Sequence, residues 1–202
     1  MSPFSAYDRI VVHTCKSDKN RWKPLQSELK RIGIDAEFQI CDESAHANVQ
    51  ATLQDVVNNP FIRRVLCFED DIRFLKDADE VYAIFNSAPN DECDICSFDN
   101  FLHLPQQLAA EVRREKGWMK YNRSVFGASC WSFNRRAAEI LLRSYLCHPN
   151  EPPDSQLFMN HQDLRSSFHS IPACIQVFYK GCQNDLNGWR EAHHAGYYGL
   201  KY

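Results

Sequence analysis

The first seventy residues alternate between strand-like and helix-like apolar patterns. A β-branched run at 9–13 is followed by apolar residues at spacings of three and four, which predict an amphipathic helix over 21–32 that ends at Gly33. A strand at 34–40, a helix at 46–58 and an apolar strand at 65–68 are predicted to follow. This alternation favours an α/β fold, in which a parallel-rich sheet is flanked by helices and ligands bind beyond the carboxyl ends of the strands.

The strand at 65–68 runs directly into three consecutive carboxylates, Glu69, Asp70 and Asp71. Adjacent carboxylates repel one another, so such a triplet calls for a divalent cation or for a set of hydrogen-bond donors. Mg²⁺ and Mn²⁺ take few carboxylates and complete their shells with water and phosphate oxygens. The sequence therefore predicts a cation site here, and the alternative is a solvated acidic loop.

Four short segments, taken in order, resemble glycosyltransferase family 25, the lipooligosaccharide-type enzymes. They are the acidic triplet, the small-residue segment 126–138, the segment 152–157 and the closing segment 175–186. The resemblance covers most of the chain, from about residue 8 to 186. It implies a single-domain GT-A-like (Rossmann-like) fold with a mixed, mostly parallel sheet flanked by helices. One domain over 1–202 is expected, with a nucleotide-sugar-binding half at 1–99 and an acceptor half at 100–202.

The resemblance also implies roles for individual residues. Glu69 and Asp71 would bind a divalent cation, Mn²⁺ or Mg²⁺, with His193 or His194 added from the C-terminal part, and Asp154 would be the catalytic base. The residues expected to bind the donor are Thr14, Arg21, Asp42, Asp70, Gly127, Ala128, Gln183 and Asp185.

Several of these residues have simpler structural interpretations. Asp154 follows two prolines, where aspartate is a good helix N-cap. Gly127 and Ala128 suit tight packing between strands as well as close approach to a ligand. Arg21 and Asp42 could be a helix-surface charge and a turn residue, and the pair of histidines could be a surface feature.

The function implied is that of a metal-dependent glycosyltransferase, specifically a hexosyltransferase. It would move a sugar from a nucleotide sugar, preferably UDP-linked, to an acceptor hydroxyl with inversion. The acceptor expected from the family is a saccharide or lipooligosaccharide. A modified base in DNA, as in phage-type DNA glycosyltransferases, and a protein hydroxyl remain open.

Two other classes of function also remain open: a non-catalytic nucleotide- or cation-binding module and a metal-dependent phosphoesterase. The formal net charge of −3 argues against a strong non-specific binder of polyanions, so nucleic acid is a possible partner that the composition does not indicate. The sequence shows no apolar run long enough for a transmembrane segment.

The nine cysteines mostly lie within apolar runs, which predicts reduced, buried thiols and a cytoplasmic protein. The one CxxC motif, Cys93 to Cys96, has no second CxxC or spaced histidine pair nearby. We therefore interpret it as part of a strand, with zinc or redox chemistry as the alternative.

Overall fold

The computed structural model describes residues 4–42, 45–99, 117–121, 128–170 and 172–176. Its first half confirms the predicted alternation of strands and helices. The elements in order are β1 (Arg9–Cys15), a 3₁₀ turn (Lys16–Asp18), α1 (Lys19–Ile32), β2 (Glu37–Cys41), α2 (Ala45–Asn58) and β3 (Arg64–Glu69). The second half contains β4 (Ile72–Phe74), α3 (Ala78–Asn86), β5 (Ile95–Ser97), β6 (Trp118–Tyr121), β7 (Cys130–Asn134), α5 (Arg135–Cys147), α6 (Pro153–Met159), β8 (Ser166–His169) and β9 (Cys174–Gln176).

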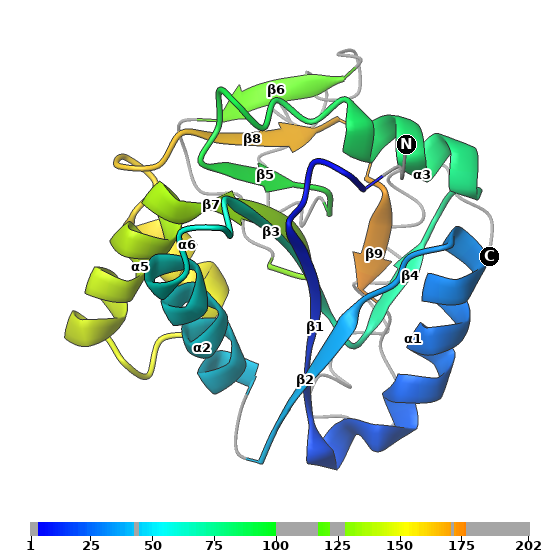
Figure 1. Ribbon diagram of the computed structural model, residues 1–202, viewed down its shortest axis with the longest axis horizontal. Coiled ribbons are helices and arrows are strands. Elements are labelled where there is room, and N and C mark those ends of the chain that lie inside the picture. The colour runs from blue at the N-terminus through cyan, green and yellow to red at the C-terminus, as the bar shows by residue number, and fades with distance from the viewer. Residues whose placement is uncertain (1–3, 43–44, 100–116, 122–127, 171, 177–202) are drawn as a thin grey trace, which may run out of the picture.

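Seven strands form one sheet in the order β2-β1-β3-β7-β5-β8-β6 (Figure 1). The pairings of β1 with β2, β1 with β3 and β5 with β8 are parallel, while β7 and β6 run antiparallel to their neighbours. Five of the seven strands therefore point the same way, which confirms the predicted mixed, mostly parallel sheet. β4 and β9 form a separate antiparallel pair.

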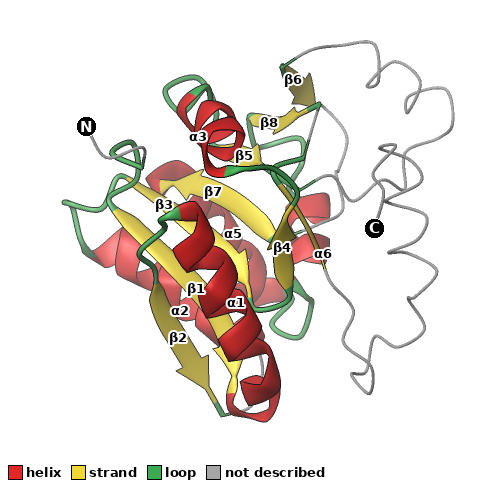
Figure 2. Cartoon of the chain, turned by 90° about the vertical axis from the view of Figure 1, so that its right-hand side faces the viewer, coloured by secondary structure: helices red, strands yellow, loops and turns green. Residues whose placement is uncertain are grey.

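Helices cover both faces of the sheet (Figure 2). The core on one face contains buried residues of α1 and α3 together with Leu66 and Phe68 of β3. The core on the other face contains residues of α2, α5 and α6 together with Val65 and Cys67. The alternation of side chains along β3 thus feeds both cores, as expected for a central strand.

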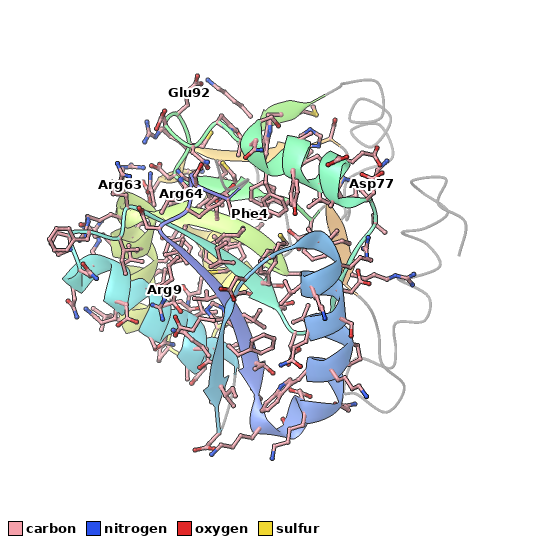
Figure 3. The ribbon with its side chains drawn as sticks, turned by 45° about the vertical axis from the view of Figure 1, so that its right-hand side comes forward. Phe4, Arg9, Arg63, Arg64, Asp77 and Glu92 are labelled. Carbon is pink, nitrogen blue, oxygen red and sulfur yellow. The ribbon has the colours of Figure 1, made fainter. Side chains whose placement is uncertain are left out.

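Charged residues near the amino ends of the strands form buried hydrogen bonds and ion pairs between segments that are distant in the sequence. Asp94, fully buried just before β5, accepts hydrogen bonds from Arg165 at 2.8 Å and forms an ion pair with Arg136 of α5. Arg64, at the start of β3 (Figure 3), is also buried and donates to the Ser132 hydroxyl at 3.1 Å. These contacts lie at the edge of the sheet opposite the acidic triplet.

The cysteines and the short strands show where sequence patterns agree with the structure and where they do not. The eight cysteines in the described part of the chain are free and six are buried, as predicted. β6 (Trp118–Tyr121), where the sequence analysis predicted no strand, pairs with β8. No helix in the described residues is long and apolar enough to cross a membrane.

The end of α1 depends on Gly33, which has a φ of 76° and donates its backbone N–H to the carbonyl groups of Leu29 and Lys30. A Cβ at this position would lie 2.7 Å from the hydroxyl of Tyr82, which itself donates to the Ile32 carbonyl. Gly33→Ala should therefore lower the free energy of unfolding by about 1–2 kcal/mol, measured by denaturant titration. In a Tyr82→Phe background, which removes the contacted hydroxyl, the loss should be smaller. An equal loss in both backgrounds would contradict the predicted contact.

Candidate active site

The strand register brings the predicted site residues to one edge of the sheet. β1, β3 and β5 all end at this edge, and β7, which lies between β3 and β5, begins there. The backbone N–H of Glu69 donates to the Ser129 carbonyl at 2.8 Å, and the N–H of Ser129 donates to Asp99 Oδ2 at 2.9 Å. Residues from three strand ends are thereby joined in one hydrogen-bonded row.

Asp70 is held by residues from the end of β1 and the first turns of α1. The Thr14 hydroxyl donates to Asp70 Oδ2, and Trp22 Nε1 donates to the Thr14 oxygen at 2.6 Å. Arg21 donates to Asp70 Oδ1 at 3.0 Å and also lies 3.6 Å from Asp71 Oδ2. Burial raises the pKa of Asp70, while Thr14 and Arg21 act in the opposite direction. The protein itself thus supplies hydrogen-bond donors that offset part of the repulsion within the acidic triplet.

Arg21 therefore lies against the carboxylates and not on the exposed surface of α1. Its side chain is only 13% exposed, and it forms a third ion pair with Asp18 at 3.5 Å. Its predicted role in donor binding stays a prediction, since a guanidinium can bind a phosphate of the donor and a carboxylate through different N–H groups.

Glu69 and Asp71 belong to a wider group of acids. Burial raises the pKa of Glu69 well above its ordinary value, and the charges of Asp71, Asp99 and Asp154 raise it further. Three carboxylates therefore lie close enough to Glu69 to oppose its ionisation, and a bound cation would relieve that repulsion. Their oxygens are the hard ligands that Mg²⁺ and Mn²⁺ prefer, so Glu69 and Asp71 fit the predicted cation.

The described residues alone do not form a complete metal centre. No group of three or more His, Cys, Asp or Glu side chains is placed to bind one metal ion in the part of the chain that the structure describes. The predicted histidine ligands, His193 and His194, lie outside the described residues, as do Gly127, Gln183 and Asp185. Glu69 and Asp71 thus stay predicted ligands, with room in the shell for water and phosphate oxygens.

Asp154, the predicted catalytic base, lies in the first turn of α6. The N-cap residue of this helix is Pro152, so the capping interpretation of Asp154 is wrong. Its Oδ1 instead accepts a hydrogen bond from the next backbone N–H, that of Ser155, at 2.9 Å. The charge of Asp154 affects the pKa of Glu69, which places the start of α6 near the acidic triplet. The side chain is partly exposed, as a base that meets a substrate requires.

Two further predicted donor-binding residues have different surroundings. Asp42 is exposed beyond β2 and forms an ion pair with Lys16 at 2.5 Å. Ala128 is buried and belongs to the core on the α2 and α5 face, which agrees with its packing interpretation. A role for either in donor binding stays a prediction.

Asp99 is the acid at this edge that the sequence analysis missed. It is 1% exposed, and burial raises its pKa to about 6 against the opposing effect of hydrogen bonds from Ser129, from its own backbone and from the Cys130 backbone. A signal was present, because Asp99 comes shortly after the CxxC motif that was interpreted as part of a strand, much as Glu69 follows its own strand. A single acid after a strand is a common pattern, however, and only the register beside Ser129 places Asp99 next to Glu69.

The raised pKa of Asp99 predicts a pH-dependent stability. Its ordinary value is 3.8, so the folded protein holds this proton more tightly than the unfolded chain does, and ionisation destabilises the fold as pH rises from about 4 to about 6. Asp99→Asn lacks this cost. The free energy of unfolding of Asp99→Asn minus that of the wild type should therefore rise with pH and level off above about 7, by at most about 3 kcal/mol. Denaturant titrations between pH 4 and 7.5 measure this difference, and a constant difference would contradict the burial effect.

Comparisons with solved structures show which known proteins have a similar fold. The glycosyltransferase GlyE from Streptococcus pneumoniae TIGR4 matches 96% of this chain with a TM-score of 0.50 and 11% sequence identity, and the match spans 61% of that protein. A glycosyltransferase involved in the glycosylation of the major capsid of PBCV-1 matches 92% of this chain and 98% of its own, with a TM-score of 0.45 and 11% identity. A197 from STIV matches 82% of this chain and 83% of its own, with a TM-score of 0.48 and 14% identity.

No protein-family model matches the sequence, and no curated protein matches it. The sheet and the similarity to GlyE together define the class: the chain has the fold of GT-A glycosyltransferases. In an α/β sheet of this kind, ligands bind at the carboxyl ends of the strands, where the acidic residues lie.

Proposed function

We propose that the protein is a metal-dependent glycosyltransferase that uses a nucleotide sugar, UDP-linked by preference, and that it is a relative of family 25. The observation that carries this proposal is the convergence of four carboxylates, from β3, β5 and α6, at the ligand-binding edge of a GT-A fold. Stability alone does not favour such a convergence, because the other three carboxylates raise the cost of ionising Glu69. A donor diphosphate with its cation is the ligand that offsets this cost.

The proposed reaction is a single displacement with inversion at the anomeric carbon. The acceptor oxygen forms a bond to that carbon, the bond from the carbon to the diphosphate breaks, and Asp154 takes the proton from the acceptor hydroxyl. Glu69 and Asp71 would hold the cation, which when bound stabilises the negative charge of the departing diphosphate.

Asp70 has a supporting part in this proposal. Because Thr14 and Arg21 fix both of its oxygens, Asp70 holds the chain between its two neighbours, Glu69 and Asp71, in one orientation. Pre-organisation of this kind lowers the cost of binding a ligand.

The proposed acceptor is a saccharide or lipooligosaccharide, as the family resemblance implies. Transfer to a modified DNA base or to a protein hydroxyl would follow the same reaction with a different acceptor. Acceptor assays with each of the three classes, using a single radiolabelled donor, distinguish them.

The proposal is tested first by binding. Isothermal titration calorimetry with UDP should show binding in the presence of Mn²⁺ that falls at least about tenfold with EDTA. Asp71→Asn should remove this dependence on the cation. The control is Asp91→Asn, which changes an exposed acid near the amino edge of the sheet and should retain the dependence. Absence of UDP binding by the wild type under all conditions would contradict the proposed donor.

Binding does not by itself separate an enzyme from a non-catalytic module of the same fold. Release of UDP from a bound UDP-sugar makes this distinction, because only the enzyme breaks the bond between sugar and diphosphate. Release of inorganic phosphate without sugar transfer would indicate a phosphoesterase instead.

A further inference from the structure

Asp99 has one carboxylate oxygen with a partner and one without. Oδ2 accepts the hydrogen bond from the backbone of Ser129, whereas Oδ1 is buried and has no hydrogen-bond partner among the described residues. Buried polar atoms are almost always paired, because an unpaired one loses its hydrogen bonds to water without replacement. An unpaired acceptor at a ligand-binding edge therefore points to a ligand that carries the missing donor.

The surroundings of Asp99 place this acceptor beside the proposed donor site. Its charge raises the pKa of Glu69 and also that of Cys174, so the carboxylate lies close to both side chains. Glu69 and Asp154, in contrast to Asp99, are partly exposed. A neutral hydroxyl group supplies the O–H donor that Oδ1 lacks.

We propose that Asp99 Oδ1 accepts a hydrogen bond from a hydroxyl group of the donor sugar and so contributes to the choice of sugar. This inference rests on the proposed function, since it assumes that a nucleotide sugar binds at this edge. It adds a residue after β5 that recognises the sugar, in addition to the acids at the end of β3 that are proposed to serve the diphosphate. A hydroxyl matched to a buried carboxylate also supports specificity, because a donor that lacks the hydroxyl leaves the acceptor unpaired.

The matched pair of variants Asp99→Asn and Asp99→Ala separates this role from a structural one. The asparagine oxygen can still accept from the Ser129 N–H, while an amide nitrogen, which cannot accept, replaces the unpaired oxygen. Asp99→Ala loses both. If Asp99 were purely structural, Asp99→Asn would bind the ligands as the wild type does, and only Asp99→Ala would be defective in binding.

The experiment compares the binding of UDP, UDP-glucose and UDP-galactose, each with Mn²⁺, to the wild type and to Asp99→Asn by calorimetry. The expected result is a loss of about 10- to 100-fold for the UDP-sugar that the wild type prefers, clearly larger than any change in the affinity for UDP itself. A second set of ligands consists of analogues of that donor that each lack one sugar hydroxyl. One of these analogues should bind the wild type less tightly than the parent donor does. The same analogue should bind Asp99→Asn as tightly as the parent donor binds Asp99→Asn.

Three results would overturn the inference. Equal affinity of both proteins for the preferred UDP-sugar would leave Asp99 with its contact to Ser129 alone. An equal loss for UDP and for the UDP-sugar would assign Asp99 to the nucleotide or the cation. If the wild type bound none of the three ligands, the proposed function would fail and the inference with it, whereas the first two results leave the proposed function intact.

Discussion

Asp71→Asn is expected to lower the rate of sugar transfer by about 100- to 1,000-fold while the protein stays folded. Asp71 is 4% exposed, lies 3.6 Å from Arg21 and contributes to the raised pKa of Glu69. Its proposed task is to hold the cation that stabilises the departing diphosphate, an effect worth several kcal/mol, and each loss of about 1.4 kcal/mol lowers a rate about tenfold. The isosteric amide retains the size of the side chain and removes its charge.

The measurement is steady-state release of UDP from a UDP-sugar at saturating Mn²⁺. Circular dichroism and a thermal unfolding scan show whether the variant is folded. Asp91→Asn is the matched control, because it removes an exposed carboxylate near the opposite edge of the sheet and should leave the rate unchanged. Wild-type activity in a folded Asp71→Asn protein would remove Asp71 from the cation site.

Asp154→Asn should lose transfer and keep donor binding. General bases contribute about 10²- to 10⁴-fold to a rate, so a loss in that range is expected for transfer to the acceptor. The asparagine oxygen can still accept the hydrogen bond from the Ser155 N–H, and the N-cap of α6 is Pro152, so the helix should be retained. A base acts on the acceptor, so the affinity for UDP with Mn²⁺ should not change.

The control for this variant is Asp163→Asn, which alters an exposed carboxylate in the turn after the other end of α6. Asp163→Asn should transfer sugar at the wild-type rate. If Asp154→Asn also did so, the partly exposed carboxylate at the start of α6 would have no part in the reaction, and another group would have to accept the proton.

The sequence predicted those parts of the site that are local in the chain. β3 and the triplet are contiguous, so an apolar run followed by three acids was enough to place Glu69, Asp70 and Asp71 at the end of a strand. The helix over 21–32 and its end at Gly33 also depend on local patterns, and both are confirmed apart from two residues at the start.

The contacts within the site depend on pairings between distant segments. Thr14 and Arg21 were predicted as separate donor-binding residues, but their hydrogen bonds to Asp70 join positions 56 and 49 residues apart. Asp99 comes near Glu69 because both form hydrogen bonds with Ser129 at the start of β7. β7 lies between β3 and β5 in the sheet, although β7 follows β5 in the chain. The apolar periodicity of the sequence does not indicate that β7 lies between β3 and β5.

Short strands were missed for a related reason. β8 has the sequence Ser-Ser-Phe-His and β4 spans three residues, which is too short for an alternating pattern to stand out. Both are strands because neighbouring strands supply their hydrogen bonds, β8 between β5 and β6 and β4 beside β9.

The central claim is that the acidic edge uses a nucleotide sugar through a divalent cation. The most direct measurement is the release of nucleoside diphosphate from a panel of nucleotide sugars, with Mn²⁺, Mg²⁺ or EDTA, in the presence and absence of saccharide acceptors. Release from one donor that requires the cation, stops with EDTA and is lost in Asp71→Asn is the predicted result. Release that continues in EDTA, or no release and no binding with any donor, would contradict the account.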